Sequence, residues 1–442
     1  MIERSVGWDQ RMPVSEVPFG GQHTSPRLPT SWVEQALIFV TVVLIPLQNN
    51  IPPVAGMSAS FLLFGALAAY TVVSRPRVLG QIWLHPSFFA AYVFIGVSAF
   101  LEFSSPLSNY GGITRFAQMI GGAVCLAVLC RDRLALTVGL YGYIAAALWV
   151  SLYLFLTSYG AIQQMGGTAN FQEATNVRES AFADSGLETN INSLAFTCTQ
   201  GAVVAFAMAV VGSSRRFLLL GIAIFCLIAA FLPMSRGAAV ISLVSFASIL
   251  HACGTKHGTA IVFVAILSLG IYAIVPDAVW SRMAFSTDQS EDGKMEGRAR
   301  IYTRALNRLP EYVVSGVGAG NYHNKWGFEK GFSKEHNGVA VVYGAHNSLF
   351  QITIYWGILG LLMFLLIVWN VYRSIPLQCA RDELALALVG ILVSLSLWLL
   401  TTHGFYEKSF ACGLGLFVGA RKWIWPTGVV SAVEGSRTSS PR

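Results

Sequence analysis

Long apolar runs separated by short polar connections dominate the pattern of this chain. Runs close to the roughly 20 residues that a helix needs to cross a bilayer lie at 33–50, 55–74, 84–103, 114–130, 134–158, 191–212, 217–234, 237–253, 259–276, 346–370, 382–402 and 404–420. The pattern breaks at 277–345, a long polar segment in which Ile301, Ala305 and Leu309 recur at helical spacing among arginines. Such spacing predicts a short amphipathic helix. The pattern as a whole predicts an all-α polytopic membrane protein with about twelve transmembrane helices and one large loop.

The arginines of the connections predict how the chain is oriented. Alternate short connections carry Arg pairs, such as Arg75 with Arg77 and Arg131 with Arg133. By the positive-inside rule these connections are cytoplasmic, which places both termini inside and the long loop outside. The predicted organisation is a disordered cytoplasmic tail (1–30), transmembrane helices 1–9 (31–276), a large periplasmic loop with short amphipathic helices (277–345), transmembrane helices 10–12 (346–423) and a cytoplasmic tail (424–442).

Composition excludes several classes of protein. The 442 residues are 54% hydrophobic and 12% charged, whereas a soluble domain carries about 25% charged residues. The net charge of +7 is scattered between apolar runs, which indicates membrane orientation rather than nucleic-acid binding. The seven cysteines lie in apolar runs or short basic connections without metal-ligand spacing. We therefore expect no disulfide framework, no structural metal and no cofactor.

A first candidate for chemistry interrupts an overlong apolar run. One helix over 217–250 would extend roughly 50 Å, against about 30 Å of hydrocarbon. The stretch LPMSRGAAV predicts a hairpin there, with Arg236 at the outer membrane edge. Arg236 is either a snorkelling residue that marks the turn or a cation aimed at an anionic ligand.

The long loop supplies further cations. Arg298, Arg300, Arg304 and Arg308 lie on the predicted amphipathic helix. Such arginines form a solvated face, contact anionic lipid headgroups, or act as bidentate donors to a diphosphate. The stretch SGVGAGN predicts a tight turn, because no βαβ pattern surrounds it. His323 and His336 are interpreted as surface histidines, whose replacement should be near neutral.

His346 and Asn347 stand where the tenth apolar run begins. His346 is either an ordinary interfacial residue or a catalytic group. A helix N-terminus disfavours an imidazolium, so a histidine there should stay neutral near pH 7, as a general base requires. Asn347 can orient a neighbouring group or bond a headgroup.

Three motifs together resemble the bacterial O-antigen ligase/polymerase superfamily. They are SRG at an outward hairpin, GR at the opening of a long outer loop, and His346-Asn347 followed by nine residues and Gly357. The resemblance covers roughly 197–367 and the twelve-span plan.

Members of that superfamily are metal-independent glycosyltransferases of the bacterial inner membrane that face the periplasm. The resemblance implies a glycan donor linked to undecaprenyl or another polyprenyl diphosphate, and an acceptor glycan or lipid A–core, with membrane lipids around the site. Arg236 and Arg298 would grip the diphosphate, and His346 would activate or orient the acceptor. Asn347, Arg300, Arg304 and His403 are candidates for supporting roles.

Several functions share this pattern. O-antigen or exopolysaccharide polymerisation and ligation are equally compatible with it, and a protein O-oligosaccharyltransferase is a further alternative. The rival class is a non-enzymatic flippase or transporter of lipid-linked oligosaccharides, which usually carries ionisable residues inside its spans. Here polar residues gather at the predicted outer face instead, among them Glu102, Asn190, Asn192, His403 and Glu407. This distribution favours the enzyme.

Overall fold

Helices make up nearly all of the structure. The protein is described by a computed structural model over residues 29–44, 59–105, 107–108, 110–159, 191–211, 214–255, 269–275, 277, 279–280, 298–336, 339–373, 382–402, 405 and 407–425. The elements in chain order are α1 (Trp32–Leu44), α2 (Ala59–Ser74), α3 (Pro76–Trp83), α4 (Pro86–Phe103), α5 (Gly111–Leu129), α6 (Arg133–Leu154), the π-helical turn η1 (Phe155–Tyr159), α9 (Ile191–Val210), α10 (Arg216–Phe231), α11 (Arg236–Ala252), α14 (Arg298–Asn307), α15 (Leu309–Tyr312), α16 (Ala319–Asn321), the π-helical turn η2 (Tyr322–Trp326), α17 (Gly327–Glu329), β1 (Ser333–His336), β2 (Val339–Val342), α18 (Ser348–Arg373), α19 (Glu383–Thr401) and α20 (Lys408–Trp423). The all-α prediction needs one addition in this part of the chain, because β1 and β2 form an antiparallel hairpin in which Ser333 faces Val342.

Six of these helices are long and apolar enough to cross a membrane. They are α4, α5, α6 with its π-helical continuation, α9, α18 and α19. The pair α2 and α3 would count as a seventh span if taken together, although it is bent by 110° at Arg75. Three shorter apolar helices, α1, α10 and α11, accompany them. These helices indicate a multi-pass membrane protein, while the full count of about twelve spans stays a prediction.

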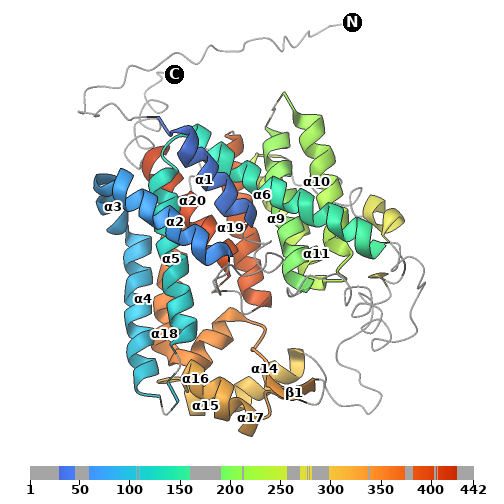
Figure 1. The fold of residues 1–442 in the computed structure, drawn as a ribbon. Coiled ribbons are helices and arrows are strands. Elements are labelled where there is room, and N and C mark those ends of the chain that lie inside the picture. Colours follow the sequence, from blue (N-terminus) through green and yellow to red (C-terminus); the bar gives the residue numbers. More distant parts are fainter. Residues whose placement is uncertain are drawn as a thin grey trace, which may run out of the picture.

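Ion pairs hold one end of the bundle together. The fully buried Glu34 at the start of α1 accepts hydrogen bonds from Arg75 (Nε to Oε1, 2.7 Å) and Arg131 (Nη2 to Oε2, 3.0 Å). Arg133 at the start of α6 pairs with Asp382, whose side chain caps α19 by accepting from the amides of its first turn. We call this the arginine end; it lies at the top of Figure 1, where α1 and α3 are found. Its prediction as the cytoplasmic side is consistent with this clustering of cations.

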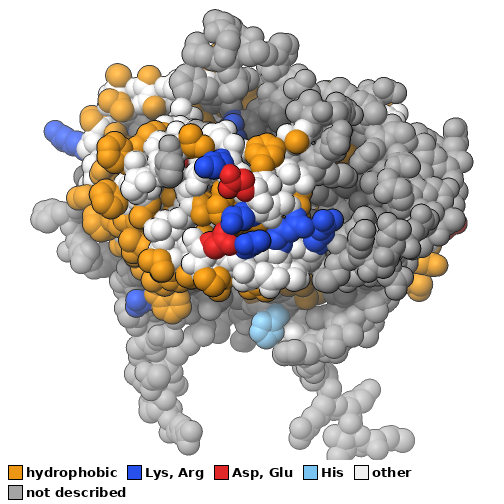
Figure 2. Space-filling model, turned by 90° about the horizontal axis from the view of Figure 1, so that it is seen from below, with side chains coloured by type: hydrophobic (Ala, Val, Ile, Leu, Met, Phe, Trp, Pro, Cys, Tyr) orange, Lys and Arg blue, Asp and Glu red, His pale blue; other side chains and the backbone are white. Residues whose placement is uncertain are grey.

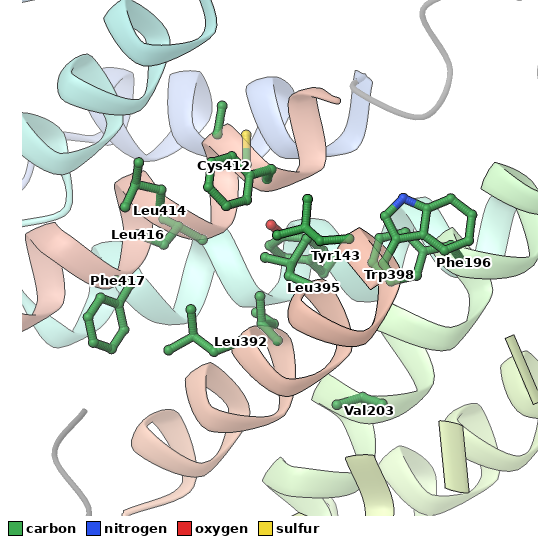
Figure 3. Close-up of a cluster of buried hydrophobic side chains, with 14 of the residues drawn as sticks. Tyr143, Phe196, Val203, Leu392, Leu395, Trp398, Cys412, Leu414, Leu416 and Phe417 are labelled. Carbon is green, nitrogen blue, oxygen red and sulfur yellow. The ribbon is translucent and has the colours of Figure 1, made fainter. Parts of the chain in front are cut away.

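The apolar core is centred on α9, which packs against α6, α10 and α19. Figure 3 shows the part of the core where side chains of α6, α9, α19 and α20 meet. The indole of Trp398 lies parallel to the ring of Phe196, with 4.3 Å between ring centroids, and Tyr143 and Leu395 lie beside them. Such close contact provides the dispersion energy that drives helix association in lipid, where the hydrophobic effect between helices is small.

Residues 298–336 and 339–345 form a small loop subdomain at the end opposite the arginine end (Figure 1). Its helix α14 buries Ile301 and Ala305, the positions that the helical spacing predicted. Seen from below in Figure 2, charged side chains gather at the centre of this face and hydrophobic ones lie along its rim. A polar surface bordered by apolar side chains is the arrangement expected where a membrane protein emerges from lipid.

A break divides α18 into two helical pieces. Trp356 and Gly357 have non-helical backbone angles, and Gly357 has φ +65° and ψ −165°, a region that is essentially restricted to glycine. The carbonyls of Ile354 and Tyr355, which the break frees, accept the amides of Val317 (2.8 Å) and Gly318 (2.9 Å). The glycine-rich stretch of the loop subdomain follows a turn at residues 313–315 and completes the hydrogen bonding of the broken helix.

Candidate functional site

His346 lies at the mouth of α18, although it does not itself open the helix. Asn347 is the residue that caps it, because its Oδ1 accepts the amides of Leu349 (2.9 Å) and Phe350 (3.2 Å). Asparagine is among the preferred residues at this position. His346 precedes the cap with φ +49°, a left-handed conformation that is uncommon for a residue with a side chain. This strained backbone sets the direction of the half-buried imidazole.

The C-terminal end of α19 holds the start of α18 in place. The Nδ2 of Asn347 donates to the carbonyl of Leu400 (2.9 Å), and the hydroxyl of Ser348 donates to the carbonyl of Thr402 (2.9 Å). Carbonyls in the last turn of a helix have no partner within it and therefore accept from outside. We call residues 400–402 the α19 end; it supports the backbone on which His346 stands.

The helix start that carries Arg236 contacts the same support. It is the first residue of α11 and follows Ser235, whose hydroxyl caps the helix by accepting the amide of Ala238 (3.4 Å). A Cβ built on the next residue, Gly237, would lie 3.7 Å from Thr401. The start of α11 therefore contacts the α19 end, and the half-buried Arg236 extends from this contact. The predicted hairpin between α10 and α11 is present at this point.

Tyr302 connects α14 to the same region. Its hydroxyl donates to the carbonyl of His346 (3.2 Å), and its ring stacks on Phe350 with centroids 5.5 Å apart. The backbone of Arg298 begins α14 one turn before Tyr302, so the two positions share a face of the helix. Tyr302 therefore joins α14 to the segment that carries His346.

The other predicted residues have different surroundings. Arg300 is exposed on α14, whereas the guanidinium of Arg304 donates to the carbonyl of Gly331 and ties α14 to the turn before β1. His403 lies outside the described residues. His336 lies in β1.

His323 is exposed, as predicted for a surface histidine, and it also makes a specific contact. Its Nε2 lies 2.7 Å from the hydroxyl of the buried Tyr355, and its ring packs edge-on against Tyr322. Desolvation of the ring lowers the pKa of His323 from its ordinary value, because it disfavours the charged form. This histidine connects the loop subdomain to α18.

Sequence reasoning missed Tyr302 and Ser348, which fix the backbone around His346. A tyrosine on an amphipathic helix and a serine directly after a cap are common, so neither carries a specific signal. Only the spacing of four residues between Arg298 and Tyr302 could have indicated that they share a face.

The arrangement brings a histidine, an arginine at a helix start and an arginine-bearing helix to one end of a membrane bundle. Guanidinium groups bind phosphate oxygens through paired N–H donors, and a neutral imidazole can accept a hydroxyl proton. The starts of α11 and α18 share the α19 end as a support, and Tyr302 joins α14 to the segment of His346.

A family model matches the middle of the chain, whereas no curated protein matches the chain. Residues 201–365 match a family model described as O-antigen ligase, and this range contains Arg236, Arg298, His346, Asn347 and Gly357. The described helices indicate a multi-pass membrane protein, and its residues 201–365 are similar to the O-antigen ligase family.

Proposed function

We propose that this membrane enzyme transfers a glycan from a polyprenyl-diphosphate carrier to an acceptor sugar hydroxyl, and that Arg236, Arg298 and His346 form its site. One observation carries the proposal: the α19 end contacts both the start of α11 and the start of α18, while Tyr302 joins α14 to His346. Three segments far apart in sequence thereby support a single region.

The chemistry assigns a role to each side chain. The acceptor oxygen attacks the anomeric carbon while the bond from this carbon to the diphosphate oxygen breaks, which inverts the anomeric configuration. His346 takes the hydroxyl proton, and Arg236 and Arg298 stabilise the charge that develops on the leaving diphosphate. Because diphosphate is a good leaving group, this scheme requires no general acid and no metal.

Transfer by purified protein with a synthetic polyprenyl-diphosphate glycan tests these roles. Replacing the catalytic base should lower the rate by about 10²–10⁴-fold, so His346→Ala and Arg298→Ala should abolish measurable product while the protein stays folded in the membrane. The matched control is His251→Ala, because His251 is exposed in the last turn of α11, at the opposite end of that helix from Arg236. Normal product yield from either site variant would remove that residue from the site.

We further propose that the site faces the periplasm of a bacterial inner membrane and that both termini are cytoplasmic. Ser315 is exposed on the loop subdomain, so Ser315→Cys should react with a membrane-impermeant maleimide in cells whose outer membrane has been permeabilised. Failure to label until the inner membrane is lysed would place the loop subdomain in the cytoplasm.

The glycans of a deletion strain separate the two biological roles. Unpolymerised single repeats would indicate an O-antigen or exopolysaccharide polymerase. Full-length chains retained on the carrier would indicate a ligase.

A further inference from the structure

A carboxylate that is remote in sequence from the proposed site is buried at the loop end of the bundle, the end that carries the loop subdomain. Glu102, in the last turn of α4, is fully buried. Its Oε2 accepts the amide of Ala319 (2.7 Å), and its Oε1 accepts the amide of Gly320 (2.9 Å). Hydrogen bonds to an ionised carboxylate are shorter and stronger than neutral ones. The carboxylate therefore anchors the loop subdomain to α4, although the bonded residues are more than 200 positions apart in sequence.

Ser105 adds a second contact between α4 and the same stretch. Its hydroxyl donates to the carbonyl of Val317 (3.2 Å). A Cβ on Gly318, which has φ +78°, would lie 2.3 Å from the Ser105 hydroxyl oxygen. No residue with a side chain fits there without displacement, so the glycine of this motif is required by close approach to α4.

The stretch that α4 holds is the one that completes the break in α18. The amides of Val317 and Gly318 donate to the carbonyls of Ile354 and Tyr355, and the amide of Ile358 donates to the carbonyl of Val313 (2.6 Å). Val317 thus bonds through its carbonyl to Ser105, just after α4, and through its amide to α18. We call residues 313–320, with their partners on α4 and α18, the glycine clamp.

The glycine clamp fixes the far end of a two-turn helix that begins beside His346. The first piece of α18, residues 348–355, is held at its start by the α19 end and at its finish by the glycine clamp. Eight helical residues span about 12 Å, so the two attachments define the direction of the whole piece. A displacement of about 1 Å at a reacting group can lower a rate about 100-fold.

We infer that Glu102 is a positioning residue for glycosyl transfer: through the glycine clamp it fixes the first piece of α18 and with it the backbone of His346. The inference rests on the proposed function of His346. Glu102 touches no substrate in this scheme, and its effect reaches the site through residues 313–320 and 354–358.

The decisive variant is Glu102→Gln, which replaces one carboxylate oxygen by an amide group that cannot accept a hydrogen bond. We expect kcat per folded enzyme to fall about 10-fold or more, with the KM for the lipid-linked donor changed less than about threefold, because alignment in the transition state is lost rather than donor binding. Ser105→Ala should act in the same direction and more weakly. The double variant should be less impaired than the product of the two single effects, because both act through one clamp.

The matched control is Glu34→Gln at the arginine end. Glu34 is also a fully buried carboxylate, so its replacement destabilises the fold without touching the glycine clamp. It should leave kcat per folded enzyme unchanged. A loss of kcat in Glu34→Gln equal to that in Glu102→Gln would reduce Glu102 to a general stabiliser and overturn the inference.

Hydrogen exchange without substrate provides a readout that does not depend on transfer. Glu102→Gln should accelerate amide exchange in residues 313–320 and also in residues 346–355, while α6 and α10 keep wild-type protection. Acceleration confined to 313–320, or a kcat within twofold of wild type, would overturn the inference. If the wild-type protein shows no transfer at all, the proposed function fails, and exchange alone decides whether the glycine clamp controls the start of α18.

Discussion

The two ends of the helical bundle use their buried carboxylates in different ways. At the arginine end, the buried Glu34 pairs directly with Arg75 and Arg131. At the loop end, the buried carboxylate of Glu102 accepts backbone amides of the glycine clamp, and ion pairs such as Arg308 with Glu311 lie at the surface.

The arginine end therefore contributes mainly to the stability of the fold. The contacts of the loop end mainly fix the position of backbone segments near His346. Around His346 the contacts run from side chains to carbonyls, as for Asn347, Ser348 and Tyr302. Changes at the two ends should therefore separate stability from activity.

The largest expected effect is at the break in α18. Gly357→Ala forces a Cβ into a backbone region essentially restricted to glycine, 2.2 Å from the carbonyl oxygen of Val314. We expect a loss of about 3 kcal/mol or more in the free energy of unfolding, together with loss of transfer. Gly96→Ala is the control, because a Cβ at that position in α4 meets open space. Thermal unfolding in detergent and the transfer assay measure both effects; similar behaviour of the two variants would show that the break is not needed.

An intermediate effect is expected at the arginine end. Glu34→Gln removes the negative charge between Arg75 and Arg131, both of which are largely buried. The free energy of unfolding should fall by about 2–3 kcal/mol, because the two guanidinium groups keep their desolvation cost without the compensating charge. Activity per folded enzyme should be retained. Denaturant unfolding with activity normalised to folded protein checks this, and a selective loss of activity would contradict the division of roles between the two ends.

The smallest effect should come from the cap of α18. Asn347→Ala removes both the cap and the bond to Leu400, at a cost of about 1–2 kcal/mol. Asn347→Asp keeps an oxygen for the amides of Leu349 and Phe350 but removes the Nδ2 donor to Leu400. The temperature of thermal unfolding should therefore be highest for wild type, lower for Asn347→Asp and lowest for Asn347→Ala. Equal losses in the two variants would assign the whole contribution to the bond with Leu400.

Helix positions were largely predictable from the sequence. The runs 84–103 and 191–212 correspond to α4 (Pro86–Phe103) and α9 (Ile191–Val210) within two residues at each end. A helix in lipid must be apolar over its whole length, so its ends coincide with the first polar residues. The break in α18 gave no such signal, because Trp356 and Gly357 are as apolar as their neighbours. The hairpin of β1 and β2 was missed for another reason: its four-residue strands are too short for a clear alternation.

The chemical types at the candidate site were also visible in the sequence. Arg236 and Arg298 are the first residues of their helices, and His346 lies two residues before α18. Their supporting contacts were not visible, since the bond from Tyr302 to His346 joins residues 44 apart and that from Asn347 to Leu400 joins residues 53 apart. Such pairs depend on how helices dock, and docking in lipid depends on shape.

The sequence by itself determined that this protein is a helical membrane protein, which segments are apolar, and which few ionisable residues border them. The tertiary structure alone decided that the α19 end supports the starts of both α11 and α18, and that Glu102 reaches the glycine-rich stretch. The physical reason is that hydropathy is a property of single residues summed along the chain, whereas hydrogen bonds between distant backbone groups exist only after the helices have packed.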